Sequence, residues 1–456
     1  MYMTLNPATG QLLREFALHD SATIEQRLAQ AAAAQQGWSR RPLAERTPLL
    51  LRVAQVLRQR RAELAALITL EMGKPIVEAE GEIDKCAWNF EHYAEHAGAY
   101  LGDECIASSA SDSRVVYDPL GLVLAVMPWN YPFWQVMRFA APALAAGNGA
   151  VLKHASTVPQ CALALESVFV QAEAPAGLFT NLLVAGSDVR HLVGDARIAA
   201  VTLTGSTPVG SRVAAQAGAL LKKQVLELGG SDPFIVLADA DIATAAKVAV
   251  KARFANTGQS CISSKRFIVE HAVADAFVEA FVAHAVALIV GDPMRRDVNL
   301  GCMARTSLRA ELHDQVLRTV AEGARLLIGG ELPAGPGAFY PPTVLDRVQP
   351  EMVAGREETF GPVAAVLRVA DADAAIAVAN GTEFGLGAAL WCGDAQRAAA
   401  LARRIDAGAV FVNGMVASDP RLPFGGIKRS GYGRELGAWG AREFTNTKLV
   451  WTGPLR

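Results

Sequence analysis

The sequence lacks both a strong net charge and a long apolar run, and each absence excludes a class of protein. Its formal net charge is −2 at pH 7, so we expect no nucleic-acid partner. No window approaches the roughly 18 consecutive apolar residues that a membrane span requires. The N-terminal segment MYMTLNPATGQLLREF has no basic region followed by an apolar one, so no secretory signal is expected. We therefore expect a cytoplasmic protein with no membrane partner.

Cysteine is sparse and dispersed. The six cysteines include no C-x-x-C pair, and no histidine stands at metal-ligand spacing from them. We therefore predict neither a disulfide framework nor a metal site. A scattered cysteine in a reducing compartment is usually a small buried apolar residue, so its surroundings must give further support before it is considered reactive.

The chain is rich in short Val-, Leu- and Ile-containing runs that alternate with Ala-rich helical stretches. This alternation predicts an α/β fold with largely parallel sheets. Because 456 residues exceed what one core usually serves, we expect two sheets in separate units. The expected strands are 121–128, 149–154, 180–185, 199–205, 224–230, 233–238, 266–270, 324–330, 362–369, 388–392 and 409–414. The expected helices are 158–172, 207–220, 242–256, 273–289, 306–322, 372–380 and 395–406.

Three other regions have a different character. Before Tyr117 the chain is expected to be mostly helical, with surface helices that end near Gly73 and Pro75. Residues 104–118 are Ser-rich and alternating, which indicates a hairpin-like flap. Residues 443–453, EFTNTKLVWTG, again have a strand-like pattern. Since an exposed strand edge is normally covered by pairing, and pairing across subunits is one way to cover it, we expect a homodimer or homotetramer.

The stretch TGQSCISSK places Cys261 in a polar, glycine-containing turn between an expected helix and an expected strand. Such a turn can expose a thiol and lower its pKa, which a nucleophile requires, but a cysteine packed under a loop is the more usual finding for such a turn. Upstream, LELGG places Glu227 at the end of an apolar run. Desolvation there would raise the pKa of the carboxyl group, as a general base requires, although a helix cap or an ion pair is the alternative.

Two further segments suggest an oxyanion site and a nucleotide site. In MPWNYPFWQ, Pro128 and Pro132 restrict the backbone around Asn130, whose amide is then an oriented donor for an oxyanion or simply completes a turn. TLTGSTPVGSR combines a strand, a turn and a helix whose N-terminus suits a pyrophosphate. Its Gly205 is followed by Gly210, a spacing that differs from the usual dinucleotide fingerprint. Lys153 lies at the end of another expected strand, 149–154.

Taken together, these segments resemble the aldehyde dehydrogenase superfamily of NAD(P)-dependent enzymes, and the resemblance covers nearly the whole chain. The matching landmarks are NPATG, EMGKP, PWNYP, GNGAVLK, TGS, LELGG, GQSC, EETFGPV, VNG and PFGGIKRSGYGRE. The resemblance implies two doubly wound, largely parallel sheet domains. Residues 1–103 and 119–227 would form a Rossmann-like NAD(P)-binding domain, 228–431 a catalytic domain, and 104–118 with 432–456 an oligomerisation arm.

The resemblance also implies roles for individual residues. Cys261 would be the nucleophile and Glu227 the general base, and Asn130 with the Cys261 backbone N–H would form the oxyanion hole. Lys153 and Ser156 would contact the adenosine ribose. The other implied cofactor contacts are Met127, Pro128, Trp129, Thr204, Gly205, Ser206, Val209, Leu228, Gly229, Glu358 and Phe360. The implied reaction passes through a thiohemiacetal and a thioester on Cys261, and Glu227 activates the water that hydrolyses the thioester.

Position 156 bears on the cofactor. Many NAD-preferring members of the family carry a glutamate here, which holds the ribose hydroxyls and repels a 2′-phosphate. Ser156 removes that repulsion and leaves Lys153 as a nearby cation, so we expect NADP as well as NAD to be accepted.

Within the family, the sequence is most similar to bacterial succinate semialdehyde dehydrogenases, whose substrate carries a distal carboxylate. Arg138, about two helical turns past Asn130, would bind this carboxylate, with Ser418 and Phe424 beside it. A salt bridge is the alternative role of Arg138. Some of these enzymes have an arginine where this chain has Ala255. The alternatives are a broad-specificity aliphatic aldehyde dehydrogenase, a coenzyme A-acylating enzyme, and a catalytically silent binding protein with this fold.

Overall fold

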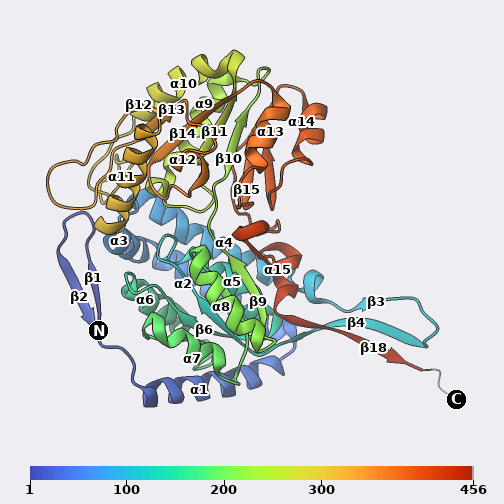
Figure 1. Cartoon of the computed structure of the whole chain (residues 1–456). Coiled ribbons are helices and arrows are strands. Elements are labelled where there is room, and N and C mark those ends of the chain that lie inside the picture. The colour runs from blue at the N-terminus through green and yellow to red at the C-terminus, as the bar shows by residue number, and fades with distance from the viewer. Residues whose placement is uncertain (454–456) are drawn as a thin grey trace.

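Two large sheets lie one above the other, each in its own unit, and a slender arm projects to one side (Figure 1). The computed structural model describes residues 1–453. The α/β fold class with two largely parallel sheets is therefore confirmed. In the described part of the chain, none of the helices combines the length and the apolar character needed to span a bilayer.

The first sheet has six strands in the order β17-β9-β8-β5-β6-β7, all parallel except for the β17–β9 pair. They are β5 (Leu122–Val126), β6 (Gly149–Lys153), β7 (Phe179–Asn181), β8 (Ile198–Thr204), β9 (Lys223–Glu227) and β17 (Gly431–Tyr432). β5 is buried at every residue: Leu122 and Leu124 face one apolar cluster, whereas Val123 and Ala125 face another. This alternation shows that helices cover both faces of the sheet.

One face is covered by α2 (Leu43–Gln59), α3 (Arg61–Met72), α4 (Ile76–Leu101), α5 (Trp134–Ala146) and α6 (Pro159–Gln171). The other face is covered by α1 (Ser21–Ser39), α7 (Val189–Gly194) and α8 (Thr207–Ala219). The helices expected before Gly73 are present and have one buried face: Leu50 and Leu57 of α2 and Ile68 of α3 are fully buried, whereas Glu45 and Arg58 on the other face of α2 are exposed. Their apolar faces pack under α4 and against α6, which the local sequence did not reveal.

The second sheet has seven strands in the order β12-β13-β14-β11-β10-β15-β16, all parallel except for β12–β13. They are β10 (Pro233–Val236), β11 (Arg266–Glu270), β12 (Arg325–Ile328), β13 (Thr343–Asp346), β14 (Val363–Val369), β15 (Gly387–Trp391) and β16 (Ala409–Val412). The helices of this unit are α9 (Ile242–Phe254), α10 (His271–Val286), α11 (Thr306–Ala321), α12 (Val353–Arg356), α13 (Ala372–Asn380) and α14 (Ala395–Ala402). Apolar clusters again lie on both faces of the sheet.

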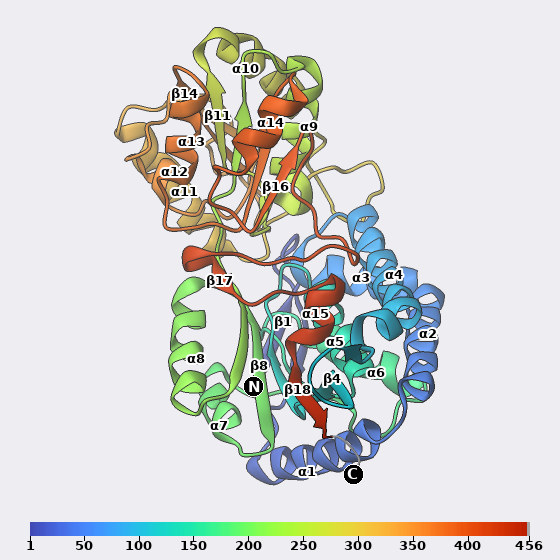
Figure 2. The same cartoon turned by 90° about the vertical axis from the view of Figure 1, so that its right-hand side faces the viewer.

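The chain crosses between the two units after β9 and again after β16. It leaves β9 at Glu227 and enters β10 at Pro233 (Figure 1). It returns from β16 to β17 (Figure 2). The Leu228–Gly230 segment between β9 and β10 therefore lies at the boundary between the units. A site at this boundary can use residues from the ends of both sheets.

The arm is a three-stranded antiparallel sheet in the order β18-β4-β3. It is formed by β3 (Glu104–Cys105), β4 (Asp112–Pro119) and β18 (Thr445–Thr452), and α15 (Gly437–Glu443) leads into β18. The strand expected at 443–453 is present, and it pairs with β4 of the same chain along its whole length. The last three residues of the predicted arm segment 432–456 lie outside the described residues.

All of the expected strands and helices are present, and their ends differ from the expected ones by a few residues. Four strands were not expected, namely β1 (Tyr2–Leu5), β2 (Leu12–Phe16), β13 and β17. β17 has two residues, which is too short for an alternating pattern to be recognised. The remaining helical turns are η1 (Gly186–Asp188), η2 (Ala255–Gly258) and η3 (Lys428–Ser430).

Candidate active site

The turn that carries Cys261 is shaped by a left-handed backbone and a buried arginine. Asn256 and Thr257 both have φ 55° immediately after α9, a conformation that is uncommon for residues with a side chain. Arg253, at the end of α9, is fully buried and donates hydrogen bonds to the carbonyl oxygens of Gly258 and Ser264, each at 3.1 Å. These contacts hold the turn on both sides of the cysteine.

Lys265 fixes the backbone of Cys261 itself. Its fully buried Nζ donates to the carbonyl oxygens of Ser260 at 2.8 Å and of Cys261 at 2.7 Å. It also lies 3.6 Å from Oε1 of Glu358. Burial raises the pKa of the Cys261 thiol to about 12, whereas the positive charges of Lys265 and Arg138 oppose this rise. The resting thiol is therefore protonated, and its proton must be transferred before it attacks.

Asn130 lies in the loop between β5 and α5 and is held by two hydrogen bonds. Its side-chain Nδ2 donates to the backbone carbonyl oxygen of Gln259 at 3.0 Å, and its backbone carbonyl oxygen accepts from Nδ2 of Asn256 at 2.9 Å. The side chain is 5% exposed, so it is fixed relative to the cysteine turn. Because a primary amide has two N–H groups, one remains available as an oriented donor.

Glu227 is the last residue of β9, where it pairs with Gly431 of β17. It is 1% exposed, and within residues 1–453 neither carboxyl oxygen has a hydrogen-bond partner. Burial raises the pKa of this carboxyl group to about 8, although Arg138 acts in the opposite direction. A carboxyl group of this kind is suited to general-base catalysis near neutral pH. It is not among the lining residues of the two cavities described next.

The first cavity, of about 430 Å³, lies at the boundary between the units and is here called the cofactor-side cavity. Its lining is Pro128, Trp129, Asn130, Thr204, Gly205, Ser206, Leu228, Gly229, Cys261, Arg305, Leu308, Glu311, Glu358 and Phe360. A side chain at position 229 would have its Cβ 2.6 Å from Oε2 of Glu358, so only glycine leaves this space open. Ser206 is the N-cap of α8, and its side chain does not bond the first turn, which leaves N–H groups there free for an anion.

Four of the predicted cofactor residues lie outside this lining. Met127 is buried, and its N–H donates to the carbonyl oxygen of Lys153 at 3.1 Å, next to the ends of β5 and β6. Lys153 is partly buried, which lowers the pKa of its amine, whereas Ser156 and Val209 are exposed. These residues lie at the carboxyl ends of the strands and at the start of α8, where a long ligand could extend from the cavity.

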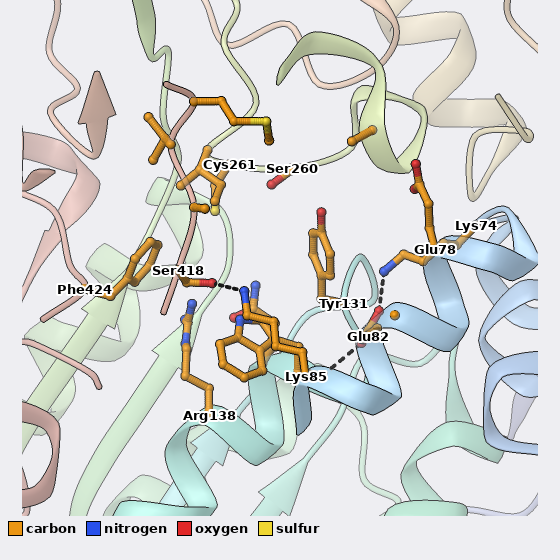
Figure 3. Close-up of a pocket in the computed structure, with 18 of the residues that line it drawn as sticks. Lys74, Glu78, Glu82, Lys85, Tyr131, Arg138, Ser260, Cys261, Ser418 and Phe424 are labelled. Atoms are coloured by element: carbon orange, nitrogen blue, oxygen red, sulfur yellow. Dashed lines mark hydrogen bonds and ion pairs between the residues drawn. The ribbon is translucent and has the colours of Figure 1, made fainter. Parts of the chain in front are cut away.

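The second cavity also measures about 430 Å³ and is here called the substrate-side cavity (Figure 3). Its lining is Lys74, Glu78, Gly81, Glu82, Lys85, Tyr131, Trp134, Gln135, Arg138, Lys251, Ala255, Ser260, Cys261, Ile262, Met415, Val416, Ala417, Ser418 and Phe424. Among the described residues, Cys261 is the one that lines both cavities. The thiol can therefore be reached by one ligand from each side.

The three predicted substrate residues meet in the substrate-side cavity. Arg138 is 2% exposed, forms an ion pair with Glu435, and lies with its guanidinium carbon 4.8 Å from the centre of the Phe424 ring. Ser418 accepts a hydrogen bond from Nζ of Lys85 at 2.7 Å. The positive charge of Arg138 is therefore already compensated by a carboxylate, as the salt-bridge alternative anticipated, although the side chain still lines the cavity.

Comparisons with known proteins agree with this geometry. The model of the aldehyde dehydrogenase family matches residues 1–450. The chain belongs to the aldehyde dehydrogenase family. A probable succinate-semialdehyde dehydrogenase (NADP+) of Synechocystis sp. is 51% identical over 98% of this chain and 99% of that protein. The Escherichia coli protein named succinate semialdehyde dehydrogenase (NAD(P)+) Sad is 49% identical over 98% of this chain and 97% of that protein.

Solved structures give the same result for the fold. This aldehyde dehydrogenase superimposes on succinic semialdehyde dehydrogenase from Streptococcus pyogenes in complex with NADP+ with a TM-score of 0.97. The two chains are 37% identical, and the match covers 100% of each. The match therefore extends over both sheets and the arm.

Sequence reasoning missed several residues of this aldehyde dehydrogenase that line its cavities. On the substrate side they come chiefly from α4 and the start of α5: Lys74, Glu78, Glu82, Lys85, Tyr131 and Trp134. On the cofactor side they are Arg305, Leu308 and Glu311 at the start of α11. The available signal was a charged residue on nearly every turn of α4, but only tertiary packing shows which turns face the cavity.

Proposed function

We propose that this aldehyde dehydrogenase oxidises succinate semialdehyde to succinate, with NADP or NAD as the hydride acceptor. The observation that carries the proposal is the position of Cys261, the residue common to two cavities of similar size. The names of the relatives from Synechocystis sp. and Escherichia coli support the substrate and the cofactors. The relative with NADP+ in its structure supports the cofactor further.

The residues around Cys261 support covalent catalysis. The Cys261 thiol would first lose its proton to water in the substrate-side cavity, and the thiolate would then attack the aldehyde carbon. The Nδ2 donor of Asn130 with the Cys261 N–H would stabilise the oxyanion of the thiohemiacetal. NADP or NAD, when bound in the cofactor-side cavity, supplies the acceptor for the hydride. The chain is then left with a thioester on Cys261. Glu227 would take a proton from the attacking water, and the acid would leave as the thiolate is restored.

The lining of the cofactor-side cavity fits a dinucleotide. Gly229 leaves open space beside Glu358, and the N-terminus of α8 offers free N–H groups for a pyrophosphate. Lys153 and Ser156 would hold the adenosine ribose, and Ser156 brings no negative charge against a 2′-phosphate. Glu358 and Phe360 would meet the nicotinamide end. The domain roles follow as part of this proposal: residues 1–103 and 119–227 bind the cofactor, and 228–431 form the catalytic domain.

One observation favours a second candidate, the oxidation of aliphatic aldehydes of broad range. Arg138 is compensated by Glu435, and Ala255 lines the cavity where some relatives have an arginine. If no free cation met the substrate, an uncharged aldehyde would bind as well as a carboxylated one. The preference between the two kinds of aldehyde therefore decides between the candidates.

A steady-state assay tests the proposal directly. Reduced nicotinamide is measured by absorbance with succinate semialdehyde or butanal, with NADP or NAD, and with or without coenzyme A. We expect the highest kcat/KM for succinate semialdehyde, turnover with NADP, and no requirement for coenzyme A. Equal kcat/KM for the two aldehydes would support the broad-range candidate, and no turnover under any condition would refute both.

We also propose that the arm joins subunits into a homodimer or homotetramer. β18 is an edge strand of its sheet, and Leu449 and Trp451 expose 65% and 53% of their surface there. An exposed apolar edge strand is normally covered by a partner. Light scattering on the full-length protein should give a mass of two or four chains. Removal of residues 445–456 should shift that mass to one chain.

A further inference from the structure

Four cationic side chains line the substrate-side cavity, and the positive charges of three of them are stabilised without a ligand. Lys74 forms an ion pair with Glu82 and lies 3.7 Å from the centre of the Tyr131 ring. Arg138 forms an ion pair with Glu435. Lys251 is exposed to solvent, which stabilises its charge. None of these three cations depends on an anion in the cavity.

Lys85 is different because its partners are neutral. Its Nζ donates to the Ser418 hydroxyl at 2.7 Å and lies 4.3 Å from the centre of the Trp134 ring. Within residues 1–453 no carboxylate oxygen lies within 4.0 Å of this amine. The acidic neighbour of Ser418, Asp419, is instead bound by Arg421 at 2.7 Å.

The surroundings of Lys85 disfavour its positive charge. The side chain is partly buried, and burial followed by the charge of Arg138 lowers the pKa of its amine to about 8. The charges of Cys86, Asp419 and Glu82 act in the opposite direction without restoring the ordinary value. A partly desolvated cation without a counter-ion is a favourable place for an anion, since the anion supplies the missing compensation.

The direction of the side chain points to the same conclusion. In Figure 3 the amine of Lys85 and the Ser418 hydroxyl project into the cavity that also receives the Cys261 thiol. Ser418 accepts the hydrogen bond from Lys85, so its own O–H remains free to donate. The pair therefore offers an ammonium and a hydroxyl donor together, which suits a carboxylate.

We infer that Lys85, with Ser418, is the principal binding group for the distal carboxylate of the substrate. This inference rests on the proposed function and assigns its specificity to a residue of α4. Arg138 then has the different task of compensating Glu435 and supporting Phe424 at the cavity wall. Lys85, rather than Arg138 as predicted from the sequence, is then the main ligand of the carboxylate.

The test compares Lys85→Met with Lys251→Met on two substrates. Methionine keeps an apolar stem against Trp134 but removes the charge, and Lys251 is a matched lysine that lines the same cavity. For Lys85→Met we expect KM for succinate semialdehyde to rise about 10- to 100-fold, as for loss of a charge-assisted hydrogen bond, and KM for butanal to change far less. Lys251→Met should leave the ratio of the two KM values within about twofold of wild type.

Equilibrium binding provides a measurement that does not depend on turnover. Calorimetric titration of succinate into the full-length protein should show binding to the wild type and to Lys251→Met, and none to Lys85→Met. Lys85→Arg retains the charge and should restore most of the affinity for succinate. If Lys85→Met does not fold, Lys85→Arg and Ser418→Ala still test the site, with a smaller loss expected for each.

Several outcomes would overturn the inference. The first is that Lys85→Met raises KM equally for both aldehydes. The second is that Lys251→Met changes the ratio of the two KM values as much as Lys85→Met does. The third is that Lys85→Met binds succinate as tightly as the wild type. Failure of the proposed function has a different signature, since the wild-type enzyme itself would then show no preference for succinate semialdehyde over butanal.

Discussion

The two cavities that meet at Cys261 have similar volumes, about 430 Å³ each, but their linings come from different elements of the fold. The substrate-side cavity is lined by long charged and aromatic side chains, many of them from α4 and α5. The cofactor-side cavity combines small residues and backbone at the ends of β8 and β9 with the edge-to-face rings of Trp129 and Phe360, 5.8 Å apart, and its charged side chains, Arg305, Glu311 and Glu358, come from the second unit. One ligand would therefore be recognised mainly by side-chain charge, and the other by shape and backbone N–H groups.

This difference predicts how the two sides respond to mutation. A single substitution can remove a charge on the substrate side and change specificity. On the cofactor side the backbone donors survive any side-chain change, so single substitutions should alter binding less, unless they add volume or charge. Cys261, which lines both cavities, and Glu227, which lines neither, should affect the chemistry itself, and so should Asn130, whose amide is held against the cysteine turn.

Cys261→Ala should have the largest effect, because it removes the residue that both cavities share. Without the thiol no covalent adduct can form, and we expect kcat to fall on the order of 10⁴-fold or more. Fluorescence titration should show that NADP still binds, since the rest of the cofactor-side lining is intact. Residual turnover within tenfold of wild type would show that the shared position is not the nucleophile.

Glu227→Gln should come next, with a loss of roughly 10²- to 10⁴-fold in thioester hydrolysis. Burial raises the carboxyl pKa from an ordinary 4.5 to about 8, so the group is protonated and inactive as a base at lower pH. The hydrolysis rate of the wild type should therefore rise about tenfold per pH unit up to about pH 8 and then level off, whereas the variant should show no such rise. Rapid-mixing measurements would show a burst of reduced cofactor followed by a slow phase in the variant.

The raised pKa of Glu227 also affects the folding stability, and the direction of this effect with pH provides a control. Between pH 4.5 and about 8 the folded protein holds a proton on Glu227 that the unfolded chain releases. This group therefore lowers the folding stability progressively as pH rises through that range. The melting temperature of Glu227→Gln should fall less over the same range than that of the wild type. A steeper fall in the variant would contradict the assignment of the pKa to Glu227.

Asn130→Asp should reduce kcat about 10²- to 10³-fold, as does removal of an oxyanion donor in other acyl-transfer sites. The change preserves the size of the side chain but replaces its N–H donor by an oxygen. Affinity for NADP should change little, since Asn130 is one of many contacts of the cofactor-side cavity. If the variant lost only NADP affinity and kcat were unchanged, Asn130 would be a cofactor-binding residue and not an oxyanion donor.

Much of the cofactor side could be predicted from the sequence because its residues follow strands directly. Thr204, Gly205 and Ser206 stand between β8 and α8, and Leu228 and Gly229 follow β9. The carboxyl ends of parallel strands meet at one edge of a sheet, so short local motifs are sufficient to bring them together. The resemblance of the motifs to a known family then supplied their roles.

The substrate side could not be predicted to the same extent, because its residues meet only through packing between distant segments. Lys85 lies in a helix of 26 residues with several other charged side chains, and its contact with Ser418 joins positions 333 residues apart. The pairing of Arg138 with Glu435 is likewise visible only after α5 packs beside α15 and the segment before it. No local rule distinguishes a lysine that faces a cavity from one that faces solvent.

Ser156→Glu should have the smallest effect and should separate the two kinds of recognition on the cofactor side. A carboxylate beside Lys153 would repel a 2′-phosphate and compensate the cation, while the backbone donors of the pyrophosphate site remain unchanged. We expect the ratio of kcat/KM for NADP to that for NAD to fall about tenfold or more. Ser156→Ala removes the hydroxyl without adding charge, and its ratio should stay within about threefold of wild type. If both variants changed the ratio equally, the serine hydroxyl rather than the absence of charge would determine the acceptance of NADP.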